Sequence, residues 1–205
     1  ASFISRVLGR GEMDAANWVA CTALYCSLAV GLAAIALMLA FLRPLLLLLG
    51  ATEGILPYAL AYARISVASS VFGLFNVTMS GIVTSEGSPR TTMNALLAGA
   101  ILNDILDPVF IYSLHLGIAG AAIVTAISQF ASTAIYLFYI LRKKSTFTFS
   151  IGECSLARDS MSEILKTGVP VLLFQLLTSL SIMLVNVQSQ AYGDSVIAGI
   201  GVVMR

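Results

Sequence analysis

The chain has 205 residues, of which 59% are hydrophobic and only 10% charged, and its mean hydropathy is +0.96. This composition lies far outside that of water-soluble domains and predicts an all-α polytopic membrane protein. A net charge of +1, with no basic run longer than residues 142–144, excludes nucleic acid as an expected partner.

The cysteines and the single histidine form no disulfide framework or metal-binding pattern. Cys21 and Cys26 fall in a predicted membrane helix, and Cys154 lies in a polar connection. His115 stands in a short loop without a second His or Cys nearby, which argues against a zinc or iron site. We therefore expect no cofactor.

Five apolar segments are long enough to cross a bilayer, whose hydrocarbon core is roughly 30 Å thick. In chain order they cover residues 15–42, 55–85, 92–112, 116–141 and 167–193, and a sixth apolar run begins at Ser195. The chain lacks an initiator Met and stops inside that last run. We expect it to be an inner portion of a longer protein.

The basic residues in the connections predict the orientation, because cytoplasmic loops carry an excess of Lys and Arg. One side of the membrane has Arg43, with Arg64 near its boundary. The other side, predicted to be cytoplasmic, has Arg6, Arg10, Arg90, Arg142, Lys143, Lys144, Arg158 and Lys166. The long polar connection 142–166 lies on that side and is expected to link two lobes, 1–141 and 167–205.

A polar cluster interrupts the third apolar segment with two carboxylates and a carboxamide. Asn103 and Asp107 are four residues apart and share one helix face, whereas Asp104 lies about 100° around the axis. Pro108 has no backbone N–H, so it leaves the Asp104 carbonyl without its helical partner and favours a kink. The cluster is a candidate cation site.

Several blocks of sequence occur in an order typical of one transporter family. They are 4–9 (ISRVLG), 49–51 (LGA), 85–90 (SEGSPR), 102–111 (LNDILDPVFI), 116–129 (LGIAGAAIVTAISQ), 168–170 (GVP) and 191–194 (AYGD). Together they resemble the multidrug and toxic compound extrusion (MATE) family, in particular its DinF-like prokaryotic branch. The resemblance covers essentially the whole chain, and its central blocks are the most specific.

The resemblance implies a complete protein of twelve helices in two pseudo-symmetric lobes. This chain would hold helices three to seven, with the tail of the second and the start of the eighth. Segment 1–141 would be an N-terminal lobe lacking its first helix and most of its second. The implied activity is export of drugs or other small organic, often cationic, compounds in exchange for Na⁺ or H⁺. The implied setting is a lipid-embedded monomer in the prokaryotic inner, or plasma, membrane.

The resemblance also implies roles for individual residues. Asp107 matches the family's coupling acid, Asn103 the carboxamide one turn before it, and Thr125 a hydroxyl on the next helix. Their oxygen atoms are of the kind that Na⁺ prefers. Asp104 would support them. Asn76 matches a polar cavity residue, and a further Asp that the family supplies from its first helix has no counterpart here.

Each of these residues also has a plainer interpretation. Asp104 and Asp107 would then be solvated or bonded to the kinked backbone, and Asn76 and Asn186 would be interhelical hydrogen-bonding residues. The other interpretation of Asn186, Met79 and Phe72 is that they line the substrate cavity with Asn76. On the plainer interpretation, Met79 and Phe72 face lipid or pack in a core.

Two alternative functions remain at this stage. One is a lipid-linked oligosaccharide flippase of the same superfamily, although such carriers tend to line their cavity with basic residues, and Arg64 is the only basic residue within the complete spans. The other is a membrane-embedded enzyme, for which the sequence lacks converging catalytic groups.

Overall fold

The computed structural model describes residues 2–49, 51, 53–142, 145–147, 158–189 and 199, and all regular structure in this part of the chain is helical. The helices are α1 (Ser2–Gly9), α2 (Met13–Ala40), α3 (Leu42–Leu48), α4 (Leu56–Ser85), α5 (Pro89–Pro108), the π-helix η1 (Val109–Ser113), α6 (Gly117–Leu141) and α7 (Arg158–Ser189).

The described residues contain five helices with the length and composition to cross a membrane. They are Met13–Ala40, Leu56–Ser85, Pro89–Ser113, Gly117–Leu141 and Gly168–Ser189. These coincide within a few residues with the five predicted spans, which confirms an all-α, multi-pass membrane protein. The apolar run from Ser195 lies outside the described residues, apart from Gly199. Helix α7 begins at Arg158, inside the connection expected to be polar linker.

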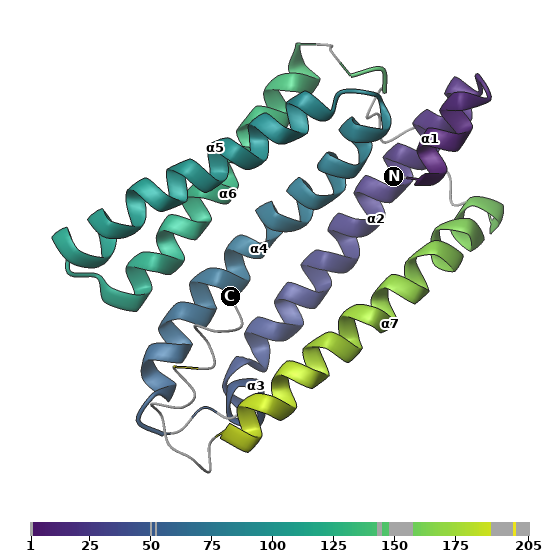
Figure 1. The fold of residues 1–205 in the computed structure, drawn as a ribbon. Coiled ribbons are helices and arrows are strands. Elements are labelled where there is room, and N and C mark those ends of the chain that lie inside the picture. The colour runs from purple at the N-terminus through teal and green to yellow at the C-terminus, as the bar shows by residue number, and fades with distance from the viewer. Residues whose placement is uncertain are drawn as a thin grey trace.

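Helices α1 to α6 form the packed part of the structure. Figure 1 shows α4 between α2 on one side and the α5–α6 pair on the other, and α4 contacts both α6 and α2 extensively. Helix α7 stands beyond α2 with its apolar side chains exposed, among them Leu172 and Phe174. The candidate site therefore belongs to the bundle of α4, α5 and α6.

A tight turn connects α4 to α5. Gly87 adopts a φ of +84°, a left-handed conformation that costs glycine little, and Pro89 then begins α5. Proline suits this first position because its fixed φ matches a helix and its missing N–H would have no partner there. The turn makes α4 and α5 antiparallel neighbours.

The main apolar cluster lies at the end of the bundle where α4 meets this turn. Its fully buried side chains include Met79, Ile82 and Val83 of α4 and Tyr136 of α6. Phe147, which follows α6 in the chain, is also buried in the cluster with 5% of its surface exposed. The beginning of the connection after α6 thus packs onto this bundle.

Glu86 lies at the same end, just after α4, and is half-buried. Its carboxylate accepts hydrogen bonds from the Tyr139 hydroxyl at 3.1 Å and from the Ser145 hydroxyl. Its partners therefore come from α6 and the segment after it. Burial raises the pKa of Glu86 above its ordinary value of 4.5, although hydrogen bonds from Ser145, Tyr139 and nearby backbone amides oppose this.

The raised pKa of Glu86 predicts a pH-dependent stability. As the pH rises from about 4.5, glutamate in the unfolded chain ionises first, so the folded state loses relative stability until Glu86 itself ionises. We expect Glu86→Gln to flatten the pH dependence of thermal unfolding of the detergent-solubilised protein in this window. A variant as pH-sensitive as the parent protein would contradict the assignment.

Pro108 ends α5. At the position of the expected kink, the backbone hydrogen bonds change from the α-helical to the π-helical pattern. The next five residues form η1, where the Leu114 amide donates to the Val109 carbonyl at 3.0 Å. A π-turn is rare and often occurs at functional sites. Gly120 of α6 lets η1 approach closely, because a Cβ there would lie only 2.8 Å from the Phe110 carbonyl oxygen.

We predict that Gly120→Ala destabilises the protein by about 1–3 kcal/mol, the usual cost of overpacking, because the atom that the new methyl group meets is backbone and cannot rotate away. Gly73→Ala is the matched control: its Cβ would meet only Gln129 Oε1, at an ordinary 4.0 Å, and it should stabilise α4 by up to about 1 kcal/mol. Thermal unfolding in detergent measures both, and equal effects would refute the close contact.

Candidate functional site

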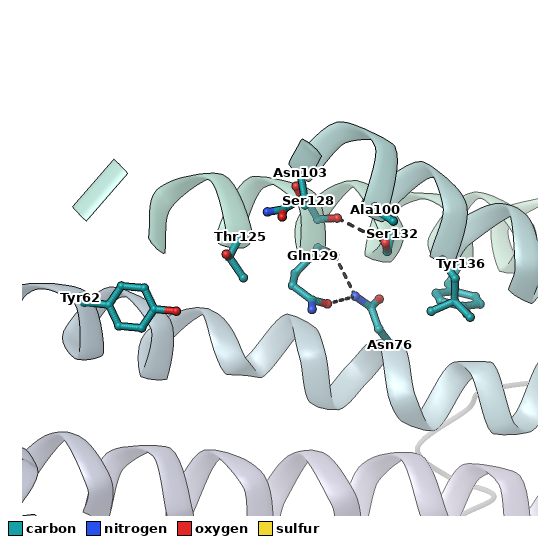
Figure 2. A pocket seen from close by; sticks show the side chains of 11 residues that line it. Tyr62, Asn76, Ala100, Asn103, Thr125, Ser128, Gln129, Ser132 and Tyr136 are labelled. Carbon is teal, nitrogen blue, oxygen red and sulfur yellow. Dashed lines mark hydrogen bonds between the residues drawn. The ribbon is translucent and has the colours of Figure 1, made fainter. Parts of the chain in front are cut away.

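A cavity of about 410 Å³ lies between α4, α5 and α6 (Figure 2). It contains no charged side chain in its lining and is rich in hydroxyl and carboxamide groups. The lining residues are Tyr62, Asn76, Leu96, Gly99, Ala100, Asn103, Thr125, Ser128, Gln129, Ser132 and Tyr136. We call this space the first cavity.

The wall from α5 has the spacing of a single helix face. Leu96, Gly99, Ala100 and Asn103 occupy positions i, i+3, i+4 and i+7, which lie on the same side of a helix. Asp107 continues the same face one turn beyond Asn103. Its side chain is partly buried, and its Oδ1 atom is fully buried without a hydrogen-bond partner in the described structure. An oxygen in this state is available to a proton or a cation.

Asp104 differs from Asp107 in its surroundings. It is exposed and lies off the face that carries Asn103 and Asp107. Of the two carboxyl groups, only that of Asp107 has an oxygen that is buried and unpaired, and the supporting role expected of Asp104 stays a prediction.

The wall from α6 brings Thr125, Ser128, Gln129, Ser132 and Tyr136 to the first cavity, and Figure 2 shows Asn76 of α4 facing Gln129. The Thr125 hydroxyl donates to the Ala121 carbonyl at 2.9 Å. Because a carbonyl only accepts, this bond uses the hydroxyl proton and leaves the Thr125 oxygen free to accept. Thr125 therefore suits a cation or an N–H donor.

Asn76 joins α4 to α6 through both ends of its carboxamide. Its Nδ2 donates to the Gln129 carbonyl at 2.9 Å and to Gln129 Oε1 at 2.8 Å, while its Oδ1 accepts from the Thr133 hydroxyl at 2.9 Å. Only 7% of Asn76 is exposed. The residue thus combines both interpretations of the sequence, since it lines the first cavity and also holds two helices together.

Helices α5 and α6 approach each other closely beside the same cavity. Ser132 of α6 donates to the Ala95 carbonyl of α5 at 2.8 Å, and Gly99 leaves the room that the Ser132 hydroxyl occupies. Small residues and hydroxyl groups commonly produce such contacts between membrane helices. This contact fixes Asn103, one turn beyond Gly99, relative to α6.

A second cavity, of about 340 Å³, opens between α4 and α6. Its lining comprises Ser66, Ser69, Ser70, Gly73, Leu74, Val77, Thr125 and Gln129. Thr125 and Gln129 line both cavities and so lie between them. The sequence analysis missed the three serines, Ser128 and Gln129, although the spacing of Ser66, Ser69, Ser70 and Gly73 marks one polar face of α4.

The other expected cavity residues lie elsewhere or are not described. Met79 has no exposed surface and belongs to the apolar cluster. Phe72 packs edge-to-face on Phe130 with ring centroids 5.5 Å apart. Neither residue lines the two cavities above, so packing describes both better. The side chain of Asn186 lies outside the described part of the structure.

Comparison with known proteins decides the family. The MatE family model matches residues 1–109, more than half of the chain. The chain belongs to the MatE family. Its similarity to curated members extends over its whole length. It is 30% identical to the multidrug export protein MepA of Staphylococcus haemolyticus and 28% identical to MepA of Staphylococcus aureus, in each case over 204 residues. It spans about 45% of the length of these relatives.

Solved structures of the MatE family share the fold. An inward-facing multidrug resistance MATE transporter of the MOP superfamily matches with a TM-score of 0.89 and 29% identity, covering 96% of this chain and 45% of that one. An outward-facing one matches with a TM-score of 0.82 and 29% identity, covering 93% and 42%. The arrangement of α4, α5 and α6 is therefore that of a known transporter fold.

We predict that Asn76→Ala destabilises the protein by about 1–3 kcal/mol, because it leaves the Gln129 and Thr133 side chains without their shared partner inside the bundle. The control is Asn94→Ala, at an exposed position of α5, which should change stability by less than about 0.5 kcal/mol. Thermal unfolding in detergent tests the pair, and an unaffected Asn76→Ala variant would show that the bonds do not stabilise the bundle.

Proposed function

We propose that the longer protein corresponding to this chain is a secondary active antiporter, which exports small organic, often cationic, compounds in exchange for Na⁺ or H⁺ by alternating access. The observation that carries the proposal is the buried, unpaired Oδ1 of Asp107, one helical turn beyond a polar cavity in a membrane-spanning segment.

The energetics of the bilayer explain why this oxygen suggests coupling. A carboxylate inside a membrane costs from about 3 to over 10 kcal/mol unless a proton, a cation or a partner neutralises it. Burial favours the protonated carboxyl group, and a nearby cation favours the ionised form. A single carboxyl group can thus hold either H⁺ or a cation, and such exclusive occupancy is the basis of antiport.

The neighbouring residues suit a hard cation. Asp107 offers a carboxylate, Asn103 an amide oxygen, and Thr125 a hydroxyl whose proton is already used. Asn103 and Thr125 line the first cavity from facing helices. In this proposal, these three residues bind Na⁺ if the protein is sodium-coupled, and Asp107 alone carries the proton if it is proton-coupled.

The relatives support this choice of activity. The MepA proteins are multidrug export proteins, and the matched structures include inward-facing and outward-facing transporters. No basic side chain lines the two described cavities of this chain, which favours cationic cargo over the phosphate groups of a lipid-linked oligosaccharide.

The remaining parts of the proposal concern setting and chemistry. The staphylococcal relatives support a prokaryotic plasma membrane, and we infer that the complete transporter works as a monomer without a cofactor. A membrane-embedded enzyme has less support, since the first cavity offers amides and hydroxyls but no acid pair or nucleophile–base pair in its lining.

We predict that Asp107→Asn in the full-length transporter abolishes ion-driven export while leaving membrane insertion and folding intact, because the amide is similar in shape but cannot exchange a proton. The control is Asn94→Ala, at an exposed position of the same helix that lines neither described cavity, and it should retain ion-driven export. Dye export from proteoliposomes under Na⁺ and H⁺ gradients is the measurement. Undiminished transport by Asp107→Asn under either gradient would refute the proposed coupling role.

A further inference from the structure

The second cavity is lined by hydroxyl groups whose protons are already committed. Ser69 and Ser70 both donate to the carbonyl oxygen of Ser66, at 3.0 and 2.9 Å. Thr125, on the opposite wall, donates to Ala121. Because a carbonyl oxygen can only accept, the proton of each hydroxyl points away to the backbone, and the lone pairs are what remains available.

Two other polar groups complete the lining. The carbonyl oxygen of the Gln129 side chain accepts from Asn76, which leaves the NH₂ as the donating part of that amide. The Ser66 hydroxyl oxygen is buried and has no partner in the described structure. It is therefore free to serve as acceptor or donor. Acceptors outnumber donors, and no charged side chain belongs to the lining.

We propose that the second cavity is a recognition subsite for cations that donate hydrogen bonds, such as amidinium, guanidinium or primary ammonium groups. The inference rests on the proposed function, whose substrate class it narrows. A cationic N–H group forms hydrogen bonds of about twice the usual strength. A quaternary ammonium ion has no N–H and leaves the acceptors of the cavity without partners once water is displaced.

The absence of a formal charge in this lining is part of the same argument. A carboxylate would bind every cation and would compete with Asp107 for the coupling ion. Neutral hydroxyl oxygens instead favour cations that carry N–H groups over cations that carry none. Since Thr125 and Gln129 line both cavities, a cation held in the second cavity shares these two residues with the cavity of Asn103. Recognition of the cargo and binding of the coupling ion would therefore involve one common wall.

The test uses the full-length transporter and two fluorescent monovalent cations built on the same fluorophore. One carries an amidinium group, and the other carries a trimethylammonium group. Binding is measured by fluorescence anisotropy in detergent, and export is measured in proteoliposomes under Na⁺ and H⁺ gradients.

The variants are Ser69→Ala/Ser70→Ala, the single Ser70→Ala at an exposed position, and Ser70→Thr, which keeps a hydroxyl. The control is Ser85→Ala, on the same helix, where the hydroxyl also donates to the backbone four residues earlier but lines neither cavity.

We expect the double alanine variant to weaken amidinium binding by about tenfold, the effect of losing a hydrogen bond to a charged donor, and to leave trimethylammonium binding unchanged. Ser70→Ala should show a smaller loss in the same direction, whereas Ser70→Thr and Ser85→Ala should bind like the parent protein.

Equal losses for the two cations, or no loss for either, would overturn the inference. A failure of the antiport proposal looks different. In that case, the parent transporter would still prefer the amidinium cation in the binding assay, and the alanine variants would lose this preference. Neither ion gradient, however, would drive export. The single Ser70→Ala variant gives the same discrimination if the double variant does not fold.

Discussion

Polar groups in a bilayer must find partners within the protein, and the link between α4 and α6 shows how this bundle meets that requirement. The Asn76 carboxamide spans the two helices, donating to Gln129 and accepting from Thr133, so that both of its polar atoms are satisfied. Since water cannot replace these bonds in the hydrocarbon core, the two helices are held in one register. Both cavities are bounded by this helix pair, and Gln129 lines each of them.

The α5 side of the bundle depends on close backbone approach instead. Gly99 admits the Ser132 hydroxyl, and Gly120 admits the carbonyl of Phe110 in η1. These two contacts lie on either side of the turn of α5 that carries Asn103 and Asp107. The helix is therefore held at both ends of the candidate coupling site, while Pro108 changes its hydrogen-bonding register immediately after Asp107. Of the four buried oxygen atoms without a hydrogen-bond partner in the described residues, the Oδ1 of Asp107 is the one that belongs to a carboxyl group, and the other three are hydroxyl oxygens.

The proposed chemistry divides into two parts that share a wall. Asp107, with Asn103 and Thr125, offers a charge and hard oxygen donors, which suits a coupling ion. The serines of α4 offer neutral acceptors, which suits an organic cation with N–H groups. In this proposal, one cavity supplies affinity for positive charge, and the other recognises the shape and hydrogen-bonding pattern of the cargo. Thr125 and Gln129 line both cavities.

Much of the fold could be predicted from the sequence because membrane helices follow from local composition. A helix satisfies its own backbone in lipid, so a predominantly apolar segment of sufficient length indicates a span without reference to its neighbours. The five spans were predicted in this way. The helix face shared by Asn103 and Asp107 also followed from spacing alone, and family resemblance supplied Thr125 as a partner.

The sequence by itself thus determined the class of protein, the spans and the polar cluster that marks the candidate site. Only the tertiary structure decided which polar residues meet. It paired Asn76 with Gln129, turned the kink expected at Pro108 into a π-turn against Gly120, and placed Met79 in the apolar cluster and Phe72 against Phe130. It also revealed the serine-lined second cavity. The physical reason is that a cavity is formed by the faces of several helices, and its existence depends on how far apart packing holds them, which no single helix encodes.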